Sequence, residues 1–153
     1  MRADMAHPFL VSCQQWRTFT APFPLAWQRL RFSNANKVNI PREPGIYAFT
    51  VEYADAGLPS HGFIMYFGIT GIRAGRNLRS RYGEYLREKT KGKRLSVQMM
   101  LVEYEADLFF HYVPLNVTPD ELKSLETKLI DAVMPPVNEG DYSAEMKRKR
   151  RAM

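Results

Sequence analysis

One helix is specified more strongly than any other element of this sequence, and it limits the folds open to the chain. Thr118 stands at an N-cap position, Pro119 at the first helical position and Glu121 at the third, which together form a capping box. Pro135-Pro136 ends the segment. Between these signals, apolar residues recur on one face of the helix: Leu122, Leu125, Leu129, Ile130 and Val133. The sequence therefore predicts an amphipathic helix from Thr118 to just before Pro135.

Strand patterns occur earlier in the chain. In Gly45–Tyr53, residues of alternating character point to opposite faces, with Tyr47, Phe49 and Val51 on one of them. A second strand is predicted over Phe63–Ile69, after a turn-rich loop at 54–62, so that 46–69 forms a β-hairpin with a long connection. Leu108–Val113 is predicted as a further strand.

Two more helical segments are predicted, and two regions of weaker pattern flank them. Asn77 is an N-cap for a helix that runs to about Lys89, whereas 95–104 is ambiguous between helix and strand on pattern alone. Residues 1–40 form an N-terminal extension with a short helix at 25–31. After Asp141 the chain becomes polar, and 142–153 is expected to be a basic flexible tail. The length of 153 residues suits one domain.

The charges are distributed in blocks. The net charge is +6, but residues 71–94 carry nine basic and two acidic side chains, 95–146 carry two basic and ten acidic ones, and 147–151 are all basic. Such asymmetry is typical of a protein that binds a polyanion, although charge blocks can also be solvated surfaces. The residues expected to contact backbone phosphates are Arg73, Arg76, Arg79 and Arg87.

Several classes of protein are excluded or disfavoured. The uncharged apolar runs are far shorter than the ~20 residues of a membrane span, and no secretory signal is evident, so we expect a cytoplasmic protein without a membrane partner. The single Cys13 excludes an intramolecular disulfide, and the three histidines have no zinc-ligand spacing. Neither a G-x-G-x-x-G nor a P-loop motif is present.

Two charged residues lie where apolar ones are expected. Glu126 follows Leu122 by four residues and precedes Ile130 by four, which places it inside the apolar arc of the capped helix. A buried unpaired carboxylate costs several kcal/mol, so such a group is usually paired or binds a metal. Arg81 lies at the edge of the apolar stripe of the 77–89 helix, and its planar guanidinium suits a carboxylate or a phosphate. Glu126 could therefore be a metal ligand, a solvated side chain or the partner of Arg81 in a structural salt bridge.

In chain order, five elements form a recognisable constellation: Gly45-Ile46-Tyr47, Tyr66-Phe67-Gly68, Arg81, Glu126 and Asn138. This constellation resembles the GIY-YIG nuclease family over residues 41–141. Phe67 replaces the usual Ile, residues 48–65 make a longer spacing than is common, and Tyr85 stands where many relatives carry His.

The resemblance implies an α/β (α+β) domain with a three-stranded antiparallel sheet flanked by helices, and it favours a helix at 95–104. It also implies a site of five catalytic residues. Glu126 would hold Mg²⁺ or Mn²⁺, and Tyr47 would orient or deprotonate the attacking water. Arg81 would bind the phosphate, with Arg79 as the alternative, although the helical stripe favours Arg81. Tyr66 would support Tyr47, and Asn138 would fix the geometry.

The function expected from these observations is metal-dependent hydrolysis of DNA phosphodiester bonds. Because one site cuts one strand, double-strand cleavage would require a homodimer or successive nicks. Two alternatives remain open at this stage: a non-catalytic nucleic-acid-binding module that retains the fold, and a structural domain in which Arg81 and Glu126 pair.

Overall fold

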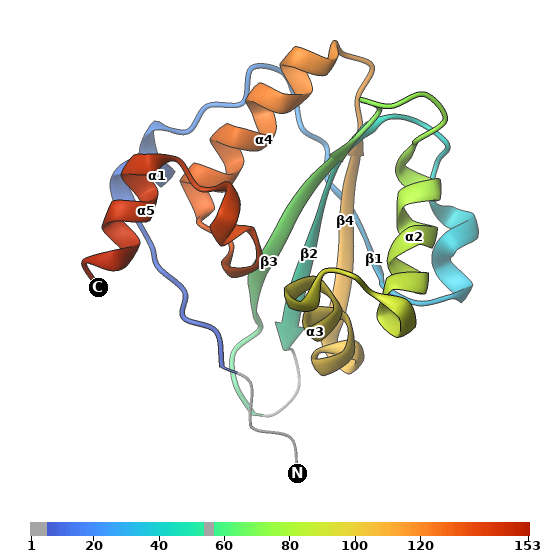
Figure 1. Ribbon diagram of the computed structural model, residues 1–153, viewed down its shortest axis with the longest axis horizontal. Helices are drawn as coiled ribbons and strands as arrows, with labels where there is room; N and C mark the ends of the chain where they lie inside the picture. Colours follow the sequence, from blue (N-terminus) through green and yellow to red (C-terminus); the bar gives the residue numbers. More distant parts are fainter. Residues whose placement is uncertain (1–5, 54–56) are drawn as a thin grey trace.

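The computed structural model describes residues 6–53 and 57–153, and its centre is a four-stranded antiparallel sheet (Figure 1). The strand order is β1-β4-β2-β3. The strands are β1 (Gln28–Arg31), β2 (Gly45–Tyr53), β3 (His61–Thr70) and β4 (Leu108–Pro114). The mixed α and β composition is as predicted, whereas the prediction of three strands is wrong because β1 adds a fourth.

Strand β1 replaces the short helix predicted at 25–31. It pairs with β4 in antiparallel register, with Gln28 opposite Tyr112 and Leu30 opposite Phe110. The Arg29 guanidinium lies 4.0 Å from the centroid of the Phe109 ring. The outer edge of β4 would otherwise present unpaired backbone groups, and pairing with it outweighs the weak local preference for a helix.

Helices cover both faces of the sheet, as Figure 1 shows for α2 and α4 on its two sides. Tyr47, Phe49 and Phe110 belong to the core on the α2 and α3 side, whereas Ile46, Ala48 and Phe67 belong to the core on the α4 side. The helices are α1 (Cys13–Thr18), α2 (Leu78–Lys91), α3 (Leu95–Glu103), α4 (Pro119–Val133) and α5 (Ala144–Arg151), with 3-10 helices η1 (Ala35–Asn39), η2 (Glu105–Asp107) and η3 (Pro136–Asp141). None of the helices in the described residues is long and apolar enough to cross a membrane.

The capping signals in the sequence are realised in α2 and α4. The Asn77 side chain accepts from the Ser80 N–H at 2.9 Å, and the Ser80 hydroxyl accepts from the Asn77 N–H at 2.9 Å. At the start of α4, the Thr118 hydroxyl accepts from the Glu121 N–H at 3.2 Å. The two N-caps and their helices are confirmed, as is a helix within 95–104, and of the capping box predicted at Thr118 the structure shows the hydrogen bond to the Thr118 hydroxyl. Part of the predicted 54–62 loop, residues 54–56, lies outside the described residues.

The C-terminal segment is helical, which corrects the prediction of a flexible tail. Ser143 caps α5 through its hydroxyl, which accepts from the Met146 N–H at 3.3 Å. Met146 is buried in the core under α4, and the Tyr142 hydroxyl reaches the carbonyl of Met134 at 2.7 Å. The composition of 142–153 is polar, but these two apolar side chains are enough to anchor the segment.

A cavity of about 470 Å³ lies on the α4 side of the sheet. Its lining is mostly aromatic and aliphatic, and it includes Trp16 and Trp27, the two tryptophans of the chain. The described part of the N-terminal segment, residues 6–40, thus packs onto the sheet through apolar side chains that include Trp16, Phe19 and Trp27.

Candidate active site

Tyr47, Arg81 and Tyr85 form one polar network between β2 and α2. The hydroxyls of Tyr47 and Tyr85 are 2.8 Å apart. Arg81 donates from Nε to the Tyr47 hydroxyl at 3.2 Å and from Nη2 to the Tyr85 hydroxyl at 3.3 Å. Both tyrosines are buried, so Arg81 brings a positive charge to the edge of an aromatic core.

Gly68 makes the position of Tyr47 sterically feasible. The two residues lie opposite each other in the β2–β3 pair. A Cβ on Gly68 would overlap the Tyr47 ring and hydroxyl, closer than real Cβ atoms approach any neighbour. Gly45 is restricted in the same way, because a Cβ there would overlap the Val113 carbonyl oxygen on β4. The glycines of both tripeptides are therefore required by close packing.

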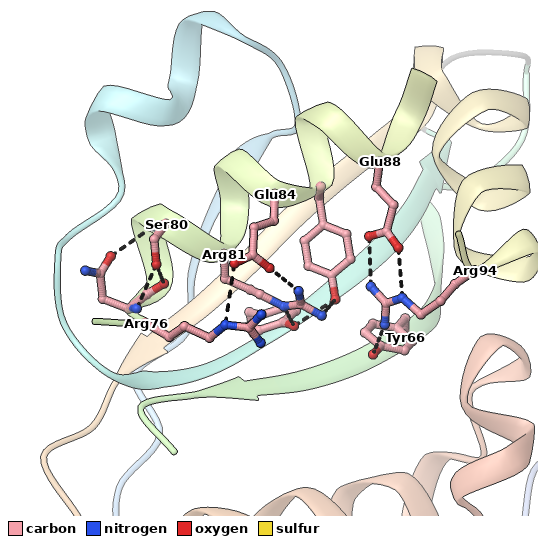
Figure 2. A network of polar contacts seen from close by, with 10 residues as sticks. Tyr66, Arg76, Ser80, Arg81, Glu84, Glu88 and Arg94 are labelled. Atoms are coloured by element: carbon pink, nitrogen blue, oxygen red, sulfur yellow. Dashed lines mark hydrogen bonds and ion pairs between the residues drawn. The ribbon is translucent and has the colours of Figure 1, made fainter. Parts of the chain in front are cut away.

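Arg81 pairs with a carboxylate of its own helix rather than with Glu126. Its Nη1 contacts Glu84, three residues further along α2, and Arg76 contacts the other oxygen of Glu84 at 3.5 Å (Figure 2). The salt bridge between Arg81 and Glu126 that the sequence left open is not formed. The reading as a purely structural domain built on that pair loses its basis.

A second arginine holds Tyr66. Arg94 donates to the two carboxylate oxygens of Glu88, each at 2.8 Å, and its Nη1 donates to the Tyr66 hydroxyl at 3.3 Å (Figure 2). The Arg94 guanidinium also lies 5.5 Å from the Tyr85 ring centroid. The signal for this residue in the sequence is weak, since Arg94 is one of nine basic residues between 71 and 94.

The two arginines line one cleft of about 710 Å³. Its other lining residues are Glu84, Arg87, Glu88, Lys91 and Lys93. Five basic side chains thus face two carboxylates that are already paired, which leaves the cleft with an excess of positive charge. Such a cleft attracts anionic ligands.

The tyrosines of the network are neutral at neutral pH. Burial raises the pKa of Tyr47 well above its usual value of 10, and the neighbouring Tyr66 raises it further, against an opposing effect of Arg81. Burial likewise raises the pKa of Tyr66 and of Tyr85. Burial alone would lower the pKa of Arg81, but the phenol oxygens of Tyr47 and Tyr85 raise it overall. These phenols are therefore hydrogen-bonding groups rather than ready bases.

Glu126 and Asn138 lie in a second group at the outer edge of β3. Asn138 accepts from the Phe67 N–H at 2.7 Å and donates to the Phe67 carbonyl at 3.0 Å. Its amide also donates to Asp141 at 3.2 Å. Burial, and then the charge of Asp141, raise the pKa of Glu126 to about 7. Within residues 6–53 and 57–153, Glu126 forms no hydrogen bond or ion pair, and no three His, Cys, Asp or Glu side chains gather as metal ligands.

The predicted phosphate-binding arginines occupy different environments. Arg87 is exposed and lines the cleft, and Arg73 is exposed in the loop before α2. Arg76 pairs with Glu84. Arg79 donates from Nε to the Ile40 carbonyl at 2.7 Å and from Nη2 to the Val38 carbonyl at 3.1 Å, so it fastens η1 to α2.

Comparisons of the chain with family models, curated proteins and solved structures gave no match. The functional argument therefore depends on the residues and their geometry.

Proposed function

We propose that this protein is a metal-dependent endonuclease of GIY-YIG type, which hydrolyses DNA phosphodiester bonds with water as the nucleophile. The observation that carries the proposal is the position of Arg81, which contacts the buried Tyr47 hydroxyl and lines the basic cleft. Attack on an anionic phosphodiester requires cations that are already in place when charge develops. Glu84, Tyr47 and Tyr85 hold Arg81 in such a fixed position.

The Glu126 carboxyl fits a divalent cation. It is partly buried, it has no hydrogen-bond or ion-pair partner among the described residues, and its pKa is raised to about 7. A nearby cation favours the ionised carboxylate and so offsets the cost of its desolvation. Glu126 would hold Mg²⁺ or Mn²⁺, and the ion when bound would supply Lewis-acid stabilisation of charge on a phosphate oxygen.

The other residues act through hydrogen bonds and charge. Arg81 binds a phosphate oxygen and stabilises the negative charge of the transition state. Ionising a phenol of ordinary pKa at pH 7 costs ~4 kcal/mol. The pKa of Tyr47 is raised above the ordinary value, so ionising Tyr47 costs still more. Tyr47 therefore orients the attacking water through its hydroxyl, Tyr66 supports the site through its hydrogen bond with Arg94, and Asn138 holds β3 in place.

The competing function is a non-catalytic nucleic-acid-binding module. It is favoured by the separation of the site into two groups, since no hydrogen bond or ion pair among the described residues joins Glu126 to Arg81 or Tyr47. Binding of a nucleic acid needs only the basic cleft, whereas cleavage needs both groups to reach the same phosphate.

Cleavage of supercoiled plasmid DNA in Mg²⁺ or Mn²⁺ tests the proposal. The wild type and a Glu126→Ala variant are compared, and Glu121→Ala serves as a matched control because Glu121 is an exposed carboxylate of the same helix. We expect the wild type and Glu121→Ala to cut the plasmid, and Glu126→Ala to leave it intact.

Intact plasmid with the wild type, at low salt and excess protein, would contradict the nuclease proposal. If the wild type also shifts the plasmid in a gel, the binding module is the better description. Equal cleavage by Glu126→Ala and the wild type would remove Glu126 from the catalytic site.

A further inference from the structure

We propose that Arg94 forms a second phosphate-binding site in the cleft, which holds a backbone phosphate next to the one bound by Arg81. The inference rests on the nucleic-acid substrate of the proposed function, and it adds a binding residue outside the five of the resemblance. Its ligand class is the phosphodiester group of a nucleic-acid strand.

Arg94 is fixed in position while part of it stays accessible. Its side chain is 40% exposed, whereas its partner Glu88 is only 14% exposed. Two hydrogen bonds of 2.8 Å join the guanidinium to that carboxylate in the planar, two-point geometry of strong Arg–carboxylate pairs. The hydrogen bond to Tyr66 fixes the third nitrogen. A side chain held in this way loses little freedom when it binds a ligand.

The guanidinium still has unused donors. An arginine carries five N–H groups, and the three hydrogen bonds to Glu88 and Tyr66 use one on each nitrogen. One N–H on Nη1 and one on Nη2 stand outside these three bonds, and the Tyr85 phenol lies beside them as a further acceptor. Two N–H groups at the end of a guanidinium match two oxygens of a phosphate.

The two arginines are held by neighbouring carboxylates of α2. Glu84 and Glu88 are four residues apart on α2, where side chains are neighbours about one helical turn, or ~5.4 Å, apart. Glu84 holds Arg81 and Glu88 holds Arg94 (Figure 2). Both guanidiniums line the cleft beside this pair of carboxylates, and both lie near the Tyr85 ring, at 4.7 Å (Arg81) and 5.5 Å (Arg94) from its centroid.

The other basic residues of the cleft are less well suited to this role. No side-chain hydrogen bond or ion pair holds Arg87, Lys91 or Lys93 among the described residues, and all three are exposed. They add to the attractive potential, but their side chains must be ordered when a ligand binds. Arg94 is already ordered.

Binding of a fluorescein-labelled DNA duplex in EDTA tests the inference without cleavage. Anisotropy titrations from about 50 to about 200 mM salt give the dissociation constant and its salt dependence. We expect Arg94→Ala to weaken binding about tenfold at the lower salt and to reduce the salt slope by about one. Arg17→Ala removes the same charge from exposed α1, which packs on α4, and should leave both quantities close to those of the wild type.

A second variant separates phosphate binding from repulsion by an exposed Glu88. Arg94→Ala alone leaves a carboxylate without its partner, whereas Glu88→Gln combined with Arg94→Ala restores the wild-type net charge. We expect the double variant to bind as weakly as Arg94→Ala and to keep the reduced slope. Unfolding curves check that both variants are folded.

An unchanged salt slope in Arg94→Ala, or recovery of wild-type affinity in the double variant, would overturn the inference. These results are independent of cleavage. If the salt slopes of the wild type and Arg94→Ala differ as expected but the wild type leaves plasmid intact in Mg²⁺, the phosphate site is supported and the nuclease proposal is contradicted. If the wild type cuts plasmid but Arg94→Ala binds DNA as the wild type does, the nuclease proposal is supported and the phosphate site at Arg94 is contradicted.

Discussion

At Gly68, a hydrogen atom occupies the place where any other residue would direct a side chain into the Tyr47 ring. We predict that Gly68→Ala displaces Tyr47 and breaks its hydrogen bonds to Arg81 and Tyr85. The expected cost is about 1–3 kcal/mol of unfolding free energy, because the ring is fully enclosed and cannot move aside without strain. The cleavage rate should fall even under conditions where the variant remains folded, since the displaced hydroxyl belongs to the proposed site.

Denaturant unfolding and plasmid cleavage measure the two effects. Gly140→Ala is the matched control, because a Cβ at Gly140 meets no atom within 4 Å. Wild-type stability and activity in Gly68→Ala would show that the close approach has no consequence.

Glu126 predicts a pH dependence of stability. Its pKa is about 7 in the folded protein against 4.5 when unperturbed, so the folded state binds more protons between these values. The contribution of Glu126 to the unfolding free energy is then fully present below about pH 4.5 and is lost as the pH rises through 7. We predict that Glu126→Gln removes this loss. At pH 8 in EDTA, its unfolding free energy should exceed that of the wild type by about 1 kcal/mol, after allowance for solvent screening of a partly exposed group.

Urea unfolding of both proteins at pH 5 and pH 8 measures this effect. Glu121→Gln provides the comparison for an exposed carboxylate of the same helix. A difference in unfolding free energy between the wild type and Glu126→Gln that is the same at pH 5 and pH 8 would contradict the prediction.

At the scale of elements, Asn138 pairs with the edge strand β3 at a place where none of the other described strands does. Its amide forms both hydrogen bonds with the Phe67 backbone that a neighbouring strand would form. We predict that Asn138→Ala costs about 2–4 kcal/mol, because two backbone groups lose their partners. Asn36→Ala removes two exposed side-chain hydrogen bonds, one donated to the Arg31 carbonyl and one accepted from the Asn39 amide, and should cost less than about 1 kcal/mol.

Hydrogen exchange adds a local measurement to the unfolding curves. Exchange of the Phe67 amide should accelerate in Asn138→Ala, whereas amides of β2 in the centre of the sheet keep their protection. Uniform acceleration of all strands would mean that the substitution destabilises the whole fold rather than this edge.

The elements that could be predicted from sequence are those with strong local signals. Caps mark α2 and α4, and alternation marks β2 over its full observed length. Strand β1 and helix α5 were missed because their structure depends on distant partners. Gln28–Arg31 becomes a strand by pairing with β4, and α5 is anchored by Met146 in a core built largely by α4 and the sheet.

The same distinction holds for the candidate site. Tyr47 and Arg81 were predicted as neighbours and are hydrogen-bonded to each other. The link from Tyr66 to Arg94 was missed, because the partner lies 28 residues away in a segment where charge alone gives no means of choosing among nine basic residues. The role of Arg79 in fastening η1 was missed for a similar reason: its acceptors are backbone carbonyls.

At the scale of the whole molecule, the basic cleft lies on the α2 and α3 side of the sheet. Under the proposed function, a single site of this kind would act on one strand at a time. We predict that nicked circular plasmid accumulates before linear plasmid at low protein concentration, and that the linear product forms from the nicked one. A time course on agarose gels, with the protein at several concentrations, measures the order of products.

Simultaneous appearance of linear and nicked plasmid at every protein concentration would contradict this order. It would indicate that two sites act together, as in a dimer. Analytical ultracentrifugation of the free protein and of its DNA complex then identifies the species that cuts.

The positions of the two tryptophans provide an optical reporter of one half of the protein. Trp16 and Trp27 both line the apolar cavity on the α4 side, whereas the cleft lies across the sheet from them. Fluorescence excited in the indoles therefore reports whether the N-terminal segment stays docked. Under the proposed function, bases in the cleft would not contact either indole, so the emission would follow the docking of this segment while the cleft is occupied.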